Sequence, residues 1–124
     1  MNNNDKKYGV WMDTQHASVV KMASEEEEKH RVLAHITSEE VTPHANENNE
    51  NNQKRMLLAK FFKEIASHLL NATHVHLTGT GQAQEQFIKY LADTPRFKQT
   101  VTEESTSVRM SDVDLLDYFA EKCK

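Results

Sequence analysis

Three side chains are suited to metal chemistry on a phosphodiester. Asp13 closes a short apolar run, and a carboxylate in such a place can hold a divalent cation in a two-metal nuclease. His74 and His76 alternate along another apolar run, so a strand would present both imidazoles on one face. Asp13 defines one candidate, a metal-dependent phosphodiesterase or nuclease, and the pair His74 and His76 defines a separate candidate metal site. We favour a simpler interpretation, in which Asp13 accepts backbone hydrogen bonds in a hairpin turn and the histidines are polar sheet residues.

Phosphate binding is indicated by a basic segment in an otherwise acidic chain. Lys54, Arg55, Lys60 and Lys63 fall within ten residues, while the net charge of the chain is −4. That net charge argues against a general nucleic-acid coat, which needs many cations to displace counterions from phosphate. The four residues could still bind RNA phosphate locally, and the alternative is an ordinary solvated helix face. Three further basic residues could extend the patch: Arg96, Lys98 and Arg109.

A third candidate is the stretch Gly79, Thr80, Gly81 and Gln82, which follows an apolar run and precedes an amphipathic one. This placement is typical of a strand-to-helix turn, where free backbone N–H groups can bind an anion. The Rossmann pattern needs a third glycine and the Walker pattern needs Gly-Lys-Ser/Thr, and neither is present. We therefore expect Gly79 to supply a backbone angle that side chains disfavour, and Thr80 to cap the helix.

Apolar periodicity predicts the elements that must position these residues. Runs that alternate with period two predict strands, and a stripe at three- and four-residue spacing predicts helices. A capping pattern at Ser111 and Asp114 marks the start of the last helix. The polar, Asn-rich residues 37–53 are predicted to be a long loop between the third strand and the first helix. The predicted strands are 8–13, 17–22, 30–36, 74–78 and 97–102, and the predicted helices are 52–71, 79–93 and 111–124.

The element order β-β-β-α-β-α-β-α predicts an α/β fold with a mixed sheet. Its first three strands should be antiparallel and the later ones should join by right-handed crossovers. This is the order of ribonuclease-H-like folds, including the translation-machinery-component type. A length of 124 residues fits one domain over 1–124.

Composition narrows the class of protein. The single Cys123 excludes an internal disulfide and a multi-cysteine zinc site. No stretch approaches the roughly 20 apolar residues of a membrane span, and the N-terminus lacks the apolar core of a signal peptide. We expect a soluble cytoplasmic protein with no cofactor, no membrane association and no DNA partner. Self-association is left open.

The combination YGVWMDTQHASVVKM (8–22), MLLAKFFKEIASHL (56–69) and HVHLTGTGQAQEQFIKYL (74–91) resembles the middle domain of archaeo-eukaryotic peptide-chain release factors and Pelota proteins. It looks still closer to the small stand-alone bacterial relatives of that domain. The resemblance covers nearly the whole chain in element order. It depends mainly on five residues: Gly9, Trp11, Asp13, Gly79 and Gly81.

The resemblance implies the fold and an association with ribosome or RNA, and it does not carry over hydrolytic activity. In such release factors a Gly-Gly-Gln tip between the third strand and the first long helix promotes ester hydrolysis. The corresponding segment here, 37–53, contains no glycine. The Gly-Thr-Gly-Gln stretch instead corresponds to a structural turn of the family. We therefore expect a non-enzymatic ribosome- or RNA-associated module, with the nuclease and a protein-interaction scaffold as alternatives.

Overall fold

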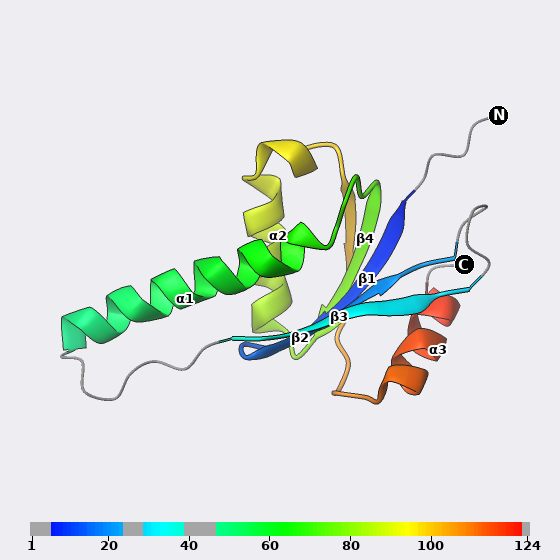
Figure 1. The fold of residues 1–124 in the computed structure, drawn as a ribbon, viewed down its shortest axis with the longest axis horizontal. Helices are drawn as coiled ribbons and strands as arrows, with labels where there is room; N and C mark the ends of the chain where they lie inside the picture. Colours follow the sequence, from blue (N-terminus) through cyan, green and yellow to red (C-terminus); the bar gives the residue numbers. More distant parts are fainter. Residues whose placement is uncertain (1–5, 24–28, 39–46, 123–124) are drawn as a thin grey trace.

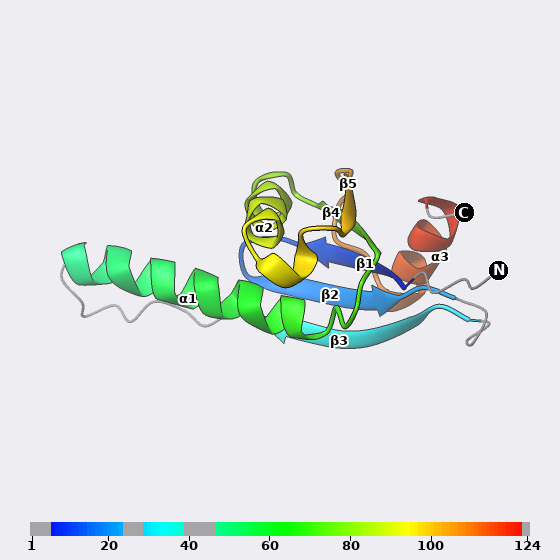
Figure 2. The same ribbon diagram turned by 90° about the horizontal axis from the view of Figure 1, so that it is seen from above.

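The computed structural model describes residues 6–23, 29–38 and 47–122, leaving the side chains of 47–52 and 122 aside. These residues form a five-stranded sheet with helices packed on both of its faces (Figure 1, Figure 2). The elements in chain order are β1 (Lys7–Met12), β2 (His16–Lys21), β3 (Arg31–Thr37), α1 (Glu47–Ser67), β4 (His74–Gly79), α2 (Gln82–Ala92), the 3-10 helix η1 (Pro95–Phe97), β5 (Val101–Glu104) and α3 (Asp112–Lys122).

The sheet is mixed, as the element order predicts. Its strands lie side by side in the order β3-β2-β1-β4-β5. The pairs β1–β2 and β2–β3 are antiparallel, whereas β1–β4 and β4–β5 are parallel. The two parallel pairs require crossover connections, which α1 and α2 supply. The predicted α/β class with a mixed, ribonuclease-H-like sheet is therefore confirmed.

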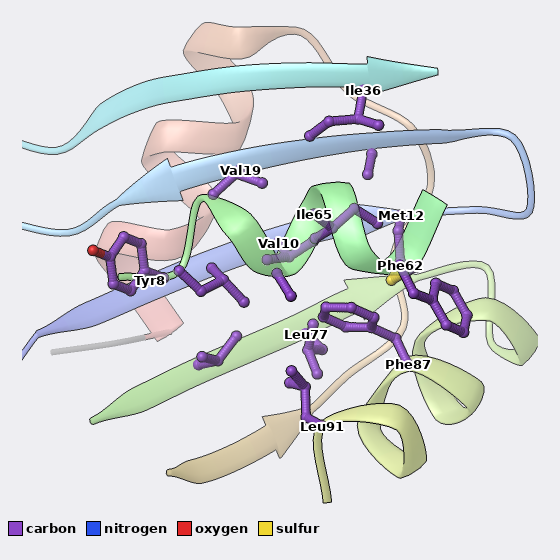
Figure 3. Packing of buried hydrophobic residues seen from close by; sticks show 14 of the residues in the cluster. Tyr8, Val10, Met12, Val19, Ile36, Phe62, Ile65, Leu77, Phe87 and Leu91 are labelled. Carbon is purple, nitrogen blue, oxygen red and sulfur yellow. The ribbon is translucent and has the colours of Figure 1, made fainter. Parts of the chain in front are cut away.

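The larger core lies between the sheet and the helices α1 and α2 (Figure 3). Side chains at alternate positions of each strand face these helices, because successive residues of a strand point to opposite sides. From α1 the apolar stripe that the periodicity predicts is buried, with Leu58 at its partly buried end. Figure 3 shows how the layers meet at Tyr8, Val10, Met12, Val19, Ile36, Phe62, Ile65, Leu77, Phe87 and Leu91.

A smaller core joins α3 to the opposite face of the sheet. It consists of Trp11, Val20, Met22, Leu115 and Phe119. The ring of Phe119 lies directly over the backbone of β1, since a Cβ built on Gly9 would be only 2.6 Å from a ring carbon. A glycine at that position therefore lets α3 approach the sheet closely.

One strand departs from the simple alternation that the sequence suggests. Strict alternation along the predicted strand 30–36 would place Val32, Ala34 and Ile36 on one face. The pairing of β2 with β3 shifts between Val19 and Val20, which leaves Leu33 as an extra residue. Such a bulge reverses the faces of the residues before it. Consequently Val32 packs in the smaller core, whereas Leu33, Ala34 and Ile36 belong to the larger one.

The predicted loop 37–53 is too long at its C-terminal end, because α1 begins at Glu47. Residues 39–46 lie outside the described ranges. The segment 47–53 contains neither glycine nor proline, so nothing in it stops a helix. An apolar stripe is needed only where a helix packs, and this half of α1 extends beyond the sheet (Figure 1, Figure 2). Within the described ranges, no helix is long and apolar enough to cross a membrane.

The last strand is also displaced from its predicted place. Residues 97–102 were expected as a strand, whereas β5 begins at Val101. Pro95 starts the 3-10 helix instead, and this turn directs Phe97 into the larger core. The apolar character of Phe97 therefore reflects burial from a turn and gives no information about the strand.

Candidate nucleic-acid interface

The four basic residues predicted to meet phosphate all lie on α1 and are exposed to solvent. Lys54 and Arg55 belong to the half of the helix that extends past the sheet, and the neighbouring Met56 is 71% exposed. Lys60 and Lys63 lie further along, on the side of the helix opposite the buried stripe. All four cations are thus in a position to meet a partner from solvent.

The arrangement around the helix axis separates these cations into two groups. Each residue of an α-helix is turned by about 100° from the one before. Lys60 and Lys63, three positions apart, therefore lie on one side, whereas Lys54 and Arg55 diverge by about 100°. Residues 53–67 contain these four basic residues and one acidic residue, Glu64. The four side chains therefore give α1 positive charge on more than one side and do not form a flat patch.

The other predicted basic residues are not part of this helix surface. The guanidinium of Arg96 donates to the carbonyl oxygen of Ala66 at 3.1 Å and lies 4.7 Å above the ring of Phe97. Arg96 therefore ties η1 to the C-terminal end of α1. Arg109 lies near α3, in a cleft on the opposite face of the sheet. Arg109 is therefore separate from the α1 surface, whereas Arg96 meets α1 at its C-terminal end.

The strand-to-helix turn at residues 79–82 differs in one detail from the prediction. Gly79 has a φ of 151° and Gly81 a φ of 123°, both values that favour glycine. The N-terminal cap of α2 is Gly81, so the prediction that Thr80 caps this helix is wrong. Thr80 is instead exposed, and Gln82 is the exposed first residue of the helix.

The residue that organises this turn is Gln84, which the sequence reasoning missed. Its side chain is fully buried, and its Oε1 accepts from the backbone N–H of Gly81 at 2.8 Å. Its Nε2 donates to the carbonyl oxygen of Ser105 at 2.9 Å. Because Gln84 occupies one of the N–H groups of the turn, fewer donors are left for an anion. The sequence does indicate this role through the three-residue spacing of Gly81 and Gln84, because a glutamine three residues after the N-terminal cap is the second half of a capping box.

Asp13 has the structural role that we favoured. Its Oδ1 accepts from the backbone N–H groups of Gln15 and His16, at 2.8 and 2.6 Å, which closes the β1–β2 hairpin. The carboxylate thereby takes the place of the Asn-Gly turn that the sequence lacks.

The predicted metal site is not assembled, because its residues lie at opposite ends of a strand pair. β1 and β4 are parallel, with His74 beside Lys7, whereas Asp13 follows Met12 at the other end. Six residues of strand separate the two ends by roughly 20 Å. Among residues 6–23, 29–38 and 47–122, no three His, Cys, Asp or Glu side chains lie close enough to hold a metal. The structure therefore does not bring Asp13 and His74 together in one metal site.

His76 belongs instead to a polar network beneath α3. Its Nε2 lies 2.8 Å from the hydroxyl of Ser105, and its Nδ1 lies 3.8 Å from a carboxylate oxygen of Glu103. This order resembles a hydrolytic triad, but the Ser105 hydroxyl is also 2.7 Å from that of Tyr118. Thr78 joins the same network through Tyr118 at 3.3 Å. We interpret the network as a connection between the sheet and α3.

Comparisons with known proteins bear on the fold. No protein-family model matches the chain, and no curated protein matches it. The solved structures that it resembles include the archaeal translation termination factor aRF1, with a TM-score of 0.63 and 14% identity over 98% of this chain. The Pelota proteins of Thermoplasma acidophilum and Archaeoglobus fulgidus give TM-scores of 0.59 and 0.58, each with 15% identity over 94% of this chain.

The likeness is confined to a part of each of those proteins. This chain spans 36% of the length of aRF1 and 32% of each Pelota. At such low identity the comparison shows a shared backbone arrangement and gives no information about activity. Nearly all of this chain therefore has the fold of one domain of the aRF1 and Pelota proteins.

Proposed function

We propose that this protein is a module of the translation machinery that binds ribosome or RNA without catalysing peptide release. The observation that carries the proposal is the likeness of 94–98% of the chain to one domain of aRF1 and Pelota. We further propose that this domain is their middle domain, on the basis of the sequence resemblance around Gly9, Trp11, Asp13, Gly79 and Gly81. The finer assignment to ribosome or RNA depends on the α1 surface.

The charge distribution supports contact through α1. An acidic protein of net charge −4 is repelled by nucleic acid as a whole, so any binding must be made by a local concentration of cations. The extended half of α1, with Lys54 and Arg55, can reach phosphates on more than one side of the helix. Lys60 and Lys63 lie on another side of the helix, so they would meet a different part of the same partner. Arginine and lysine contacts of this kind set position and affinity without reading sequence.

The absence of a release activity is supported by the glycine content. The chain has only Gly9, Gly79 and Gly81, and none of them lies between β3 and α1. Residues 47–53, where the loop was predicted, are instead helical. A tip that delivers a glutamine needs backbone flexibility, which glycines provide and a helix removes. Gln53 and Gln82 are both within helices, and neither follows two glycines: Gln53 follows Asn52, and Gln82 follows Thr80 and Gly81.

Ribosome co-sedimentation at low salt tests the proposed surface. Replacing Lys54 and Arg55 together by glutamate should weaken binding by about tenfold or more, because two attractive phosphate contacts become repulsive. The matched control is Lys89→Glu with Lys98→Glu, which makes the same charge change at two exposed positions outside α1, one on α2 and one at the end of η1. The control should bind like the unaltered protein. Equal binding of all three proteins would contradict the assignment of α1.

The salt dependence and a nuclease treatment separate RNA contacts from protein contacts. Each phosphate contact should contribute about 0.7–0.9 to the slope of log affinity against log salt, so the loss of two contacts should reduce that slope by about 1.4–1.8. Nuclease treatment of a native lysate should release the unaltered protein from its partners. Association that survives nuclease and is insensitive to salt would instead indicate a protein-interaction scaffold.

A further inference from the structure

A serine, a histidine and an aspartate are joined by hydrogen bonds on the face of the sheet that α3 covers. The hydroxyl of Ser18 lies 3.0 Å from Nδ1 of His35, and Nε2 of the same imidazole lies 3.1 Å from a carboxylate oxygen of Asp112. Ser18 and His35 are partners in the β2–β3 pair, and Asp112 is the first residue of α3. Two strands and one helix therefore assemble the three side chains of a nucleophile, a base and an orienting acid.

The order of these contacts determines which nitrogen of the imidazole carries the proton. An ionised carboxylate can only accept hydrogen bonds, so Asp112 favours the tautomer of His35 that is protonated at Nε2. Nδ1 is then left with its lone pair, and it accepts the hydrogen bond of the Ser18 hydroxyl. In this arrangement the imidazole can take the proton of the hydroxyl, and the carboxylate holds the ring in position.

The Ser18–His35–Asp112 triad is open to a substrate. All three residues line a cleft of about 580 Å³. This volume is within the range of small-molecule sites, about 300–1,000 Å³. The side chains of His35 and Asp112 are 58% and 54% exposed, so a molecule in solvent can reach them. Met110 and Leu115 line the same cleft and supply apolar surface against which an acyl or alkyl group can pack.

The network around His76 differs from this triad in two respects. The Ser105 hydroxyl contacts the hydroxyl of Tyr118 as well as His76, whereas within the described residues the Ser18 hydroxyl makes one hydrogen bond, to His35. His76 is only 7% exposed, and neither it nor Ser105 lines the cleft. A base that substrate cannot reach has a structural role, so only the triad in the cleft is suited to chemistry.

A positive group lies in the same cleft as the triad. Arg109 lines the cleft, and its guanidinium carries a permanent charge. The cleft also adjoins the first turn of α3, where the helix dipole favours negative charge. Hydrolysis of an ester passes through an intermediate in which the former carbonyl oxygen is negative, and a nearby cation stabilises it. Arg109 is thus the group in this cleft that can meet such an oxyanion.

We propose that this triad hydrolyses small carboxylic esters. The hydroxyl oxygen of Ser18 attacks the carbonyl carbon, its proton passes to Nδ1 of His35, and the carbonyl oxygen becomes negative beside Arg109. Collapse of this intermediate breaks the ester C–O bond, and His35 gives the proton to the departing alkoxide. A water molecule, deprotonated by His35 in the same way, then attacks the acyl group on Ser18. This second step releases the carboxylic acid and restores the serine hydroxyl.

The inference goes beyond the proposed function and does not depend on it. The triad and α1 lie on opposite faces of the sheet, so RNA contacts through α1 and ester hydrolysis would use separate surfaces. Peptide release is a different reaction here, because it needs the glycine-bearing tip that residues 37–53 do not provide.

Turnover of p-nitrophenyl acetate, followed by the absorbance of the released p-nitrophenolate, tests the activity. Ser18→Ala should reduce the rate to that of buffer, and His35→Ala should lower kcat by about a hundredfold or more. The controls are Ser67→Ala, at an exposed position on α1, and His74→Ala, which removes an imidazole outside the cleft. Both controls should match the unaltered protein. Absence of turnover by the unaltered protein, or equal turnover in Ser18→Ala, would overturn the proposal.

A fluorophosphonate probe, which forms a covalent adduct with activated serines, identifies the nucleophile independently. Mass spectrometry of the labelled protein should find the adduct on Ser18, and His35→Ala should prevent its formation. Asp112→Asn should lower kcat and leave KM unchanged, because an amide can donate to Nε2 and so favour the wrong tautomer of His35. An adduct on another serine, or none, would refute the role of Ser18. An unchanged kcat in Asp112→Asn would refute that of Asp112, whatever the ribosome experiment shows.

Discussion

Replacing Gly79 by alanine is expected to lower the free energy of unfolding by about 3 kcal/mol or more. A Cβ at this position would lie 1.8 Å from the backbone oxygen of Met12, well inside any real contact distance. Gly79 and Met12 are partners in the β1–β4 pair, so the strands at the centre of the sheet would have to separate. The φ of 151° adds backbone strain. A loss of this size is a large part of the 5–15 kcal/mol typical of a domain.

Gly81→Ala is the matched comparison for Gly79→Ala. Gly81 also has a positive φ, of 123°, but a Cβ there would meet no atom within 4 Å. The stability lost in Gly81→Ala should therefore come from backbone strain alone, about 1–2 kcal/mol. Urea unfolding followed by circular dichroism measures both variants on one scale. If the two alanine variants lost the same stability, the close approach of β1 to Gly79 would be refuted.

Replacing Gln84 by alanine is expected to cost about 2–3 kcal/mol. The side chain links two backbone groups, the N–H of Gly81 and the carbonyl of Ser105, and its removal leaves both without this partner. It also leaves a void at a fully buried position. Because Ser105 directly follows β5, the change should loosen the packing of this edge of the sheet against α2.

Gln86→Ala is the control for this change, because Gln86 is exposed on the same helix. Its stability should remain within about 0.5 kcal/mol of the unaltered protein. Hydrogen exchange at the amide of Gly81 provides a second readout, and it should accelerate in Gln84→Ala alone. An unchanged midpoint of urea unfolding in Gln84→Ala would show that the two hydrogen bonds contribute little.

Much of the fold follows from local patterns in the sequence. The alternation of Val10 and Met12 with Trp11 predicts which face of β1 each side chain occupies, and the two cores confirm it. The stripe through Phe61 and Ile65 similarly predicts the buried side of α1. Such patterns are reliable where an element packs on one side, because burial then selects residues at the period of the element.

The features that sequence reasoning missed depend on partners distant along the chain or on the absence of packing. The bulge at Leu33 exists only in the pairing of β3 with β2. The first turns of α1 lack an apolar stripe because that half of the helix extends past the sheet. The role of Gln84 requires Ser105, which lies 21 residues later. Local periodicity in the sequence cannot predict strand register, the extent of helix packing or a contact between distant residues.

The candidate site likewise has some features that residue types predict and others that depend on the three-dimensional fold. The four cations on α1 were identified from their types, yet their directions around the helix depend on where the helix begins and which side packs. His74 and Asp13 suggested one site by residue type, and the parallel register of β1 and β4 places them at opposite ends. The cleft between residues of β1–β3 and residues 109–112 could not be foreseen, because it is formed by the packing of α3.

Ribosomes with radiolabelled peptidyl-tRNA in the peptidyl site offer the most direct measurement, because binding and hydrolysis are read from the same sample. After incubation with saturating protein and pelleting, we predict that the protein is found with the ribosomes and that the labelled peptide stays attached to its tRNA. Absence of the protein from the pellet would contradict ribosome binding. Release of the peptide at a rate that is lost on replacing Gln53 or Gln82 would contradict a non-catalytic module.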